Sequence, residues 1–160
     1  HTDPAFADAL VRFGEAAQPA VQIVKRIKNP DEQVRRTTSI MKAMARFFWF
    51  TVEFGLMRAP DGKGVKAYGS GLLSSYGELQ HSIESPDVQR FPIQLEWVIN
   101  QYFEIDHYQP LLFIVESFEH LFEQVGVLED WMKQGKLDNV SPGEPSLSEL
   151  DVRSFIEASA

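Results

Sequence analysis

The sequence has no cysteine among its 160 residues. This absence excludes disulfide bonds and thiolate metal ligands, and it favours a reducing, cytoplasmic compartment. Basic residues are also in the minority, because 15 Lys and Arg stand against 23 Asp and Glu and give a formal net charge of −8. An acidic chain repels polyanions, so we expect neither a nucleic acid nor an anionic membrane surface as a partner.

Long hydrophobic runs are missing as well. No stretch approaches the roughly 20 apolar residues that a membrane-spanning helix needs, and no signal-peptide pattern opens the chain. We therefore expect no membrane partner. What the sequence does contain is a 44% share of hydrophobic residues and a 12% share of aromatic residues, which is enough to build the core of one globular domain.

Periodicity and turn residues predict a predominantly helical chain with a few short strands, an α+β fold. The predicted helices cover residues 4–17, 21–29, 30–57, 75–83, 94–101 and 117–134, with a short helical patch at 147–156. The predicted strands cover residues 65–68, 102–105 and 111–115. Helix starts are expected at Asn29-Pro30, at Ser75 with Glu78 as a capping box, and at Ser117.

Glu53 is the one ionisable side chain between Phe47 and Met57. A carboxylate in such apolar surroundings is costly unless it is protonated, pairs with a basic group or binds a metal ion. On a helix it shares a face with Trp49, and Arg46 lies near the same stripe. Spacing alone leaves two interpretations open: an ion pair between Glu53 and Arg46, or the single carboxylate ligand of a non-haem iron.

Three blocks of the sequence decide between these interpretations. They are residues 49–56 (WFTVEFGL), 66–80 (KAYGSGLLSSYGELQ) and 108–118 (YQPLLFIVESF). In this order the blocks resemble the pterin-dependent aromatic amino acid hydroxylase family, over a stretch from about residue 5 to residue 124. The resemblance implies that residues 1–134 are the C-terminal part of the catalytic domain and that residues 135–160 form a Pro-, Gly- and Ser-rich tail with a short helix. It also implies a helical basket around a non-haem iron.

The resemblance further implies a reaction. An aromatic amino acid ring is hydroxylated with O2, using Fe(II) and tetrahydrobiopterin or a related tetrahydropterin. Phenylalanine, converted to tyrosine, is the favoured substrate, although tyrosine and tryptophan hydroxylases share the three blocks. The expected partners are therefore a small-molecule aromatic amino acid and O2. Because the tail lacks the sustained apolar heptads of a coiled coil, we also expect a monomer.

Individual residues take roles from the same resemblance. Glu53 matches the glutamate ligand of the iron. Five neutral residues match positions that bind the substrate (Trp49, Gly71 and Ser74) or line the pterin (Ala45 and Phe48). Many family members have tyrosine where this chain has Phe48, so ring packing is kept but the hydrogen bond of the phenol is lost. No further catalytic residue is assigned.

The histidines depart from the family pattern. The two histidine ligands of the family lie in a His-x-x-x-x-His segment just upstream of the part that residues 5–6 match, and no such pair occurs here. The four histidines of the sequence are His1, His81, His107 and His120. They are too scattered to replace the pair, so we expect residues 1–160 alone to bind no iron tightly and to be inactive. A second hypothesis is a non-catalytic helical binding or regulatory module that retains the scaffold without iron.

Overall fold

The computed structural model describes residues 4–143, 153 and 156–158 of the chain. The helices are α1 (Pro4–Ala16), α2 (Gln18–Arg26), α3 (Pro30–Phe48), the π-helical turn η1 (Trp49–Glu53), α4 (Ser70–Leu73), α5 (Tyr76–Glu84), α6 (Leu95–Asn100) and α7 (Phe118–Lys133). The strands are β1 (Leu56–Arg58), β2 (Val65–Ala67), β3 (Gln89–Pro92) and β4 (Leu111–Val115). The helical patch predicted at residues 147–156 lies almost entirely outside the described residues.

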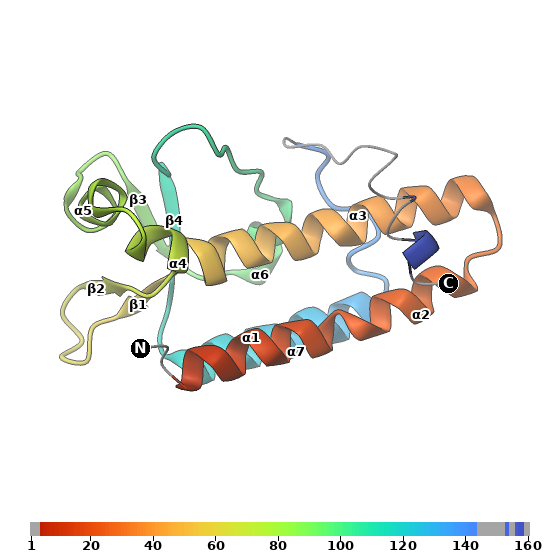
Figure 1. The fold of residues 1–160 in the computed structure, drawn as a ribbon, viewed down its shortest axis with the longest axis horizontal. Helices are drawn as coiled ribbons and strands as arrows, with labels where there is room; N and C mark the ends of the chain where they lie inside the picture. The colour runs from red at the N-terminus through yellow and green to blue at the C-terminus, as the bar shows by residue number, and fades with distance from the viewer. Residues whose placement is uncertain (1–3, 144–152, 154–155, 159–160) are drawn as a thin grey trace.

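The longer helices run along the long axis of the molecule, and the small sheet stands at one end of them (Figure 1). Helix α1 lies beside α7, and α3 runs alongside this pair with α6 packed against it. The sheet, together with α4 and α5, is found where α3 ends. The predominantly helical α+β fold expected from the sequence is confirmed. No helix in the described part of the chain is long and apolar enough to cross a membrane.

Helix α3 begins where the sequence predicts. The side chain of Asn29 accepts hydrogen bonds from the N–H groups of Asp31 and Glu32, each at 3.0 Å, and Pro30 occupies the first helical position. These contacts satisfy N–H groups that would otherwise lack a partner at the helix start. Ser75 and Ser117 likewise cap α5 and α7 through their side-chain oxygens, so the predicted starts of these three helices are confirmed.

The end of α3 differs from the prediction, and the helix expected over residues 30–57 is wrong at its C-terminal end. The α-helix stops at Phe48, the five residues of η1 follow, and Leu56 already belongs to β1. Leu56 and Met57 are buried as strand residues, since β1 pairs with β2 on one side and with β4 on the other. An apolar run of this kind satisfies burial equally well as helix or as strand, and the partner strands decide.

The sheet has the strand order β2-β1-β4-β3. Strands β1 and β2 are antiparallel, whereas β4 is parallel to both β1 and β3. The strand predicted at residues 102–105 is wrong. Both edges of β4 are already paired, one with β1 and one with β3, so this segment has no edge of β4 left to join. The strands at β1 and β3 were not predicted.

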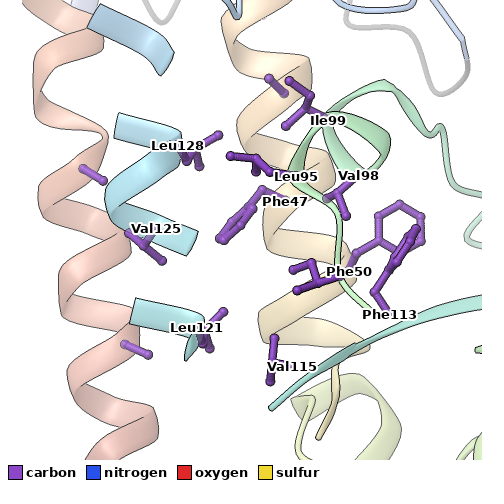
Figure 2. Close-up of a cluster of buried hydrophobic side chains, with 14 of the residues drawn as sticks. Phe47, Phe50, Leu95, Val98, Ile99, Phe113, Val115, Leu121, Val125 and Leu128 are labelled. Atoms are coloured by element: carbon purple, nitrogen blue, oxygen red, sulfur yellow. The ribbon is translucent and has the colours of Figure 1, made fainter. Parts of the chain in front are cut away.

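The main hydrophobic core lies between α3, α6 and α7 (Figure 2). Phe47 and Phe50 project from the end of α3 and from η1 into this core, and both side chains are almost completely buried. Around them lie the buried residues Leu95, Val98 and Ile99 of α6 and Leu121, Val125 and Leu128 of α7. The segment that carries the candidate site is therefore anchored by two aromatic side chains within the core.

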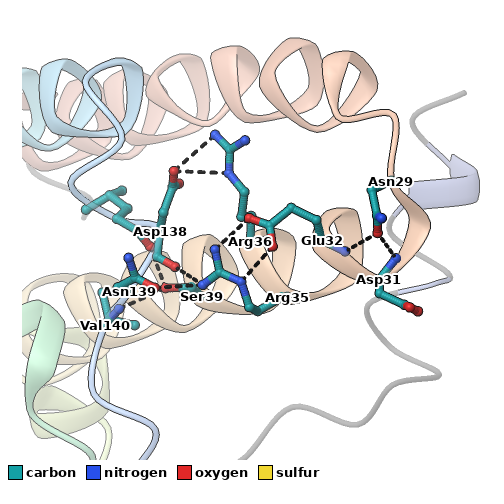
Figure 3. A network of polar contacts seen from close by, with 10 residues as sticks. Asn29, Asp31, Glu32, Arg35, Arg36, Ser39, Asp138, Asn139 and Val140 are labelled. Atoms are coloured by element: carbon teal, nitrogen blue, oxygen red, sulfur yellow. Dashed lines mark hydrogen bonds and ion pairs between the residues drawn. The ribbon is translucent and has the colours of Figure 1, made fainter.

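The segment at residues 137–143, which follows α7, is bound along α3. Five polar side chains of α3 form hydrogen bonds with it: Arg35, Arg36, Ser39, Lys42 and Arg46. The hydroxyl of Ser39 donates to the carbonyl of Leu137 at 2.5 Å and accepts from the N–H of Val140 at 2.9 Å (Figure 3). These bonds attach the segment to the helix that leads to the candidate site.

Candidate active site

Glu53 is the last residue of η1, and its side chain is half-buried. Within the described ranges its carboxylate has no hydrogen-bond or ion-pair partner. The ion pair with Arg46 that spacing left open is wrong. The buried guanidinium of Arg46 instead donates to the carbonyl of Ile99 at 2.8 Å, and desolvation lowers its pKa from the ordinary value. Glu53 therefore keeps a free carboxylate, as a metal ligand requires.

The π-helical turn determines how Glu53 is presented. The N–H of Phe54 donates to the carbonyl of Trp49 at 2.9 Å, a bond that spans five residues instead of four. The hydroxyl of Thr51 donates to the carbonyl of Phe47 at 2.6 Å, which satisfies a carbonyl near this change in helical register. Single π-turns within α-helices occur frequently at functional sites.

Glycines bring the turn between β2 and α4 against the backbone of Glu53. A Cβ atom at Gly69 would lie 2.6 Å from the carbonyl carbon of Glu53, and a Cβ atom at Gly71 would lie 2.9 Å from its carbonyl oxygen. Only a residue without a side chain allows such an approach. Next to them, Ser70 donates from its hydroxyl to the carbonyl of Val52 at 3.4 Å. The turn thus fixes the position of the main chain that carries the Glu53 side chain.

Tyr68 lies on the other side of this backbone. Its ring and hydroxyl pack against Gly55, where a Cβ atom would collide with them. The hydroxyl is buried and has no hydrogen-bond partner in the described part of the chain, and burial raises the pKa of the phenol. Tyr68 contributes its aromatic ring, which packs edge-on against Phe6 and Phe118.

Trp49 is held in an aromatic stack. Its ring lies parallel to the ring of Phe103, with centroids 4.2 Å apart and an interplanar angle of 9°, and it also contacts the ring of Phe54 at 4.4 Å. Its indole N–H donates to the side-chain oxygen of Gln109 at 3.1 Å. Gln109 was not singled out by the sequence, and its place in the third sequence block, directly before Pro110, was the one available signal.

A cavity of about 310 Å³ opens beside these residues. Its lining includes Phe54, Gly71, Glu78 and Gln109. Of the three residues expected to bind substrate, Gly71 lines the cavity directly, and Trp49 contacts the wall through Phe54 and Gln109.

The remaining predicted residues are placed as follows. The hydroxyl of Ser74 is exposed and donates to the carbonyl of Gly71 at 3.0 Å, within its own turn. Ala45 is exposed on α3, and Phe48, one turn further on, is half-buried against the ring of Phe13, with centroids 5.4 Å apart. The roles of all these residues stay predictions.

The three histidines that the structure describes share no metal-ligand group with Glu53. The ring of His81 contacts Tyr108, and His120 accepts a hydrogen bond from the N–H of Glu116. His107 belongs to an exposed group with two carboxylates, those of Glu104 and Asp106. In the part of the chain that the structure describes, this is the one group of three ligand side chains close enough to share a metal ion, and Glu53 is not in it. Among the described residues, Glu53 therefore belongs to no group of three side chains that could hold a metal ion.

The comparisons with known proteins agree with the three sequence blocks. The profile of the biopterin-dependent aromatic amino acid hydroxylases matches residues 30–137, a range that contains all six predicted site residues. The chain belongs to this family. As a member of the biopterin-dependent aromatic amino acid hydroxylases, it is 41% identical over 96 residues to phenylalanine-4-hydroxylase from Rattus norvegicus, a match that covers 60% of this chain and 19% of the rat protein.

Solved hydroxylase structures give the same result. A variant of phenylalanine hydroxylase from Chromobacterium violaceum superposes with a TM-score of 0.65 at 27% identity, covering 91% of this chain and 48% of that one. The iron- and phenylalanine-bound structure of the same bacterial enzyme superposes with a TM-score of 0.62 at 26% identity, covering 91% of this chain and 50% of that one. The present chain thus spans about half the length of these hydroxylase structures and a fifth of the rat enzyme.

Proposed function

We propose that this chain forms part of the catalytic domain of a phenylalanine hydroxylase, an enzyme that hydroxylates the ring of phenylalanine to give tyrosine with O2, Fe(II) and a tetrahydropterin. The observation that carries this proposal is the free carboxylate of Glu53 at the end of a π-helical turn, in the sequence block that resembles the family's iron site. Support comes from the bacterial phenylalanine hydroxylase, whose structure contains iron and phenylalanine.

Glu53 is the proposed carboxylate ligand. Bound iron supplies the activation of O2 that an organic side chain cannot provide. A facial triad also needs two imidazoles, and in this proposal both come from residues outside those described. The role of this chain is to hold the carboxylate in place, because Gly69 and Gly71 pack directly against the carbonyl of Glu53.

The cavity beside Phe54 and Gly71 is the proposed site of the aromatic ring of the substrate. Trp49 gives this region its aromatic character through its contacts with Phe54 and Phe103. Aromatic walls favour an aromatic ligand through ring packing and area burial.

Ala45 and Phe48 are the proposed pterin contacts. They lie one turn apart on α3. Phe48 directly precedes Trp49, so the proposed pterin contacts lie next to the proposed substrate contacts in the chain. Ala45 is exposed on this face and leaves room for a flat ring system, against which Phe48 can pack.

The experiment that tests the proposal uses Glu53→Gln in the full-length protein. This variant keeps the shape of the side chain but removes the charge that balances Fe(II), so iron content and pterin-dependent hydroxylation of phenylalanine should both fall to near background. Glu104→Gln is the matched control, because Glu104 belongs to the one described group of three side chains that could hold a metal ion. Loss of iron in the control but not in Glu53→Gln would overturn the assignment.

A non-catalytic binding module is the second candidate, favoured by the single ligand that the described residues offer. It predicts full-length wild-type protein that binds phenylalanine but contains no iron and forms no tyrosine. A tyrosine or tryptophan hydroxylase would instead contain iron and hydroxylate one of those amino acids faster than phenylalanine. Assays with all three substrates separate these outcomes.

A further inference from the structure

Gln109 is a buried polar residue whose hydrogen bonds reach η1, α5 and its own loop. Its residue surface is 4% exposed. The side-chain oxygen accepts from the indole N–H of Trp49 at 3.1 Å, and the side-chain nitrogen donates to the carbonyls of Glu104 at 2.7 Å and His107 at 3.4 Å. A buried amide satisfied on both ends has a fixed orientation, because rotating it would break these bonds and leave polar groups without partners.

The main chain of Gln109 extends the connection to α5. Its N–H donates to a carboxylate oxygen of Glu78 at 3.3 Å, and Glu78 is itself buried, with 7% of its surface exposed. This bond also explains why the capping box at Ser75 is only half formed: the hydroxyl of Ser75 accepts from the N–H of Glu78, while the Glu78 carboxylate binds Gln109. One residue thus joins η1, the loop before β4 and α5.

The ring of Trp49 depends on this connection for its orientation. Stacking on Phe103 and contact with Phe54 fix the plane of the Trp49 ring. Aromatic stacking alone still allows the ring to slide and rotate within that plane. The indole N–H is the one polar atom of the side chain, and its bond to Gln109 removes that freedom. Because Phe54, Glu78 and Gln109 all line the 310 Å³ cavity, the orientation of Trp49 determines the shape of the cavity wall behind Phe54.

We propose that Gln109 is a positioning residue that selects the aromatic amino acid by fixing the Trp49 ring against the cavity through the Trp49–Gln109–Glu78 connection. The inference rests on the proposed function, since it assumes that this cavity receives the ring of the substrate. Gln109 does not touch the reacting atoms. It acts through Trp49. Its loss lets the Trp49 ring tilt, so the cavity fits phenylalanine less closely and accepts the larger indole ring of a tryptophan substrate.

The test uses three variants of the full-length, iron-loaded protein: Gln109→Met, Trp49→Phe and the two combined. Gln109→Met keeps the length of the side chain but has no strong acceptor for the indole. Losing one such hydrogen bond should raise KM for phenylalanine about fivefold, with a smaller change in kcat, and should reduce the preference for phenylalanine over tryptophan by a similar factor. In the Trp49→Phe background, which has no indole N–H, adding Gln109→Met should leave the preference unchanged.

The chain contains a matched control. Trp97 of α6 donates from its indole N–H to the side-chain oxygen of Gln101, the residue that follows α6, at 3.0 Å, which is the same kind of bond between the same residue types. Gln101→Met should therefore shift the indole ¹⁵N–¹H signal of Trp97 and leave the substrate preference unchanged. Gln109→Met should shift the signal of Trp49 and leave that of Trp97 in place.

The outcomes separate the two proposals. A wild-type protein that hydroxylates no aromatic amino acid refutes the proposed function, while the indole signals still report whether Gln109 orients Trp49. An unchanged substrate preference in Gln109→Met, or an equal effect of this variant with and without the Trp49 indole, overturns the positioning role. Should Gln109→Met not fold, Trp49→Phe removes the indole N–H through which Gln109 acts and should by itself reduce the preference for phenylalanine. An unchanged preference in Trp49→Phe would then refute the inference.

Discussion

Gly69 packs so closely against Glu53 that a Cβ atom on the glycine would lie 2.6 Å from the carbonyl carbon of the glutamate. The residues are 16 positions apart in the sequence and belong to different elements: Glu53 ends η1, and Gly69 precedes α4. The contact is reinforced by the N–H groups of Tyr68 and Gly69, which both donate to the carbonyl of Gly55 at 3.1 Å. The backbone of the proposed iron ligand is thus enclosed by main-chain atoms that have little room to shift.

Gly69→Ala is therefore expected to destabilise the protein. The added methyl group meets backbone atoms, not the flexible end of a side chain, and overpacking of this kind costs about 1–3 kcal/mol of the free energy of unfolding. Urea denaturation of the variant and the wild type measures this difference. Gly14→Ala is the control, because the Cβ added at this position in α1 meets no atom within 4 Å and should be neutral or stabilising. Equal stability of Gly69→Ala and wild type would refute the close packing.

The helix starts were predictable because their signals are local. The cap at Asn29 and the cap at Ser117 both depend on residues within three positions of the capping side chain. The strand at residues 111–115 was predictable for a related reason, since a continuous apolar run between turn residues indicates a buried strand. In each case the sequence window that forms the element also contains the reason for it.

The elements that were missed depend on distant partners. Strands β1 and β3 have three and four residues. Strand β1 pairs with β2 and β4, and β3 pairs with β4, so each depends on at least one partner that is distant in the sequence. The π-turn at Trp49 was hidden within an apolar run whose spacing suits an uninterrupted α-helix. Such short elements carry too few residues for a periodic pattern, so tertiary pairing determines them.

The candidate site likewise contains one residue that the sequence indicates and one that only distant contacts reveal. Glu53 stood out as a lone acid within an aromatic run, and among the described residues it has no hydrogen-bond or ion-pair partner. Gln109 did not stand out, because its importance comes from Trp49, 60 residues earlier in the chain, and from Glu78. A polar residue beside a proline is typical of a loop, and only the folded structure shows that this one is buried and bonded on both ends.

The ion pair between Arg12 and Glu129 predicts a specific pH dependence. It joins α1 to α7 with 2.6 Å between the guanidinium nitrogen and the carboxylate oxygen. The hydrogen bond from Arg12, and secondly that from Lys133, lowers the pKa of Glu129 below its ordinary value of 4.5. Because the pKa is lower in the folded protein, the pair stabilises the fold above the unfolded-state pKa, and this contribution is lost as the pH falls through the folded-state value.

Glu129→Gln should consequently cost about 0.5–1 kcal/mol of the free energy of unfolding at pH 7, and the difference from wild type should vanish in acid well below pH 4.5. Denaturation curves of both proteins between pH 7 and pH 3 measure this convergence. Glu123→Gln, on the exposed face of the same helix, serves as the control and should match wild type across the range. A cost of Glu129→Gln that persists unchanged at pH 3 would show that the contribution of Glu129 is not electrostatic.

Ser39 provides the last prediction, because one hydroxyl attaches the segment after α7 to α3. Its oxygen accepts from Val140 and its hydrogen is donated to Leu137, and the side chain is buried with 8% of the residue exposed (Figure 3). Ser39→Ala leaves the partly buried N–H of Val140 and the buried carbonyl of Leu137 without this partner, so the free energy of unfolding should fall by about 2 kcal/mol. The amide hydrogen of Val140 should also exchange with solvent faster, by about tenfold or more.

Thr38→Ala is the matched control for this prediction. The neighbouring hydroxyl of Thr38 donates to the carbonyl of Val34 within α3 itself, at 2.7 Å, and reaches no other element. Such a bond adds little to helix stability, and alanine is the better helix former, so Thr38→Ala should be nearly neutral. If both variants were equally stable and exchange at Val140 were unchanged, Ser39 would not hold the segment. If Ser39→Ala alone is destabilised and Val140 exchanges faster, the hydroxyl holds residues 137–143 against the helix that leads to Glu53.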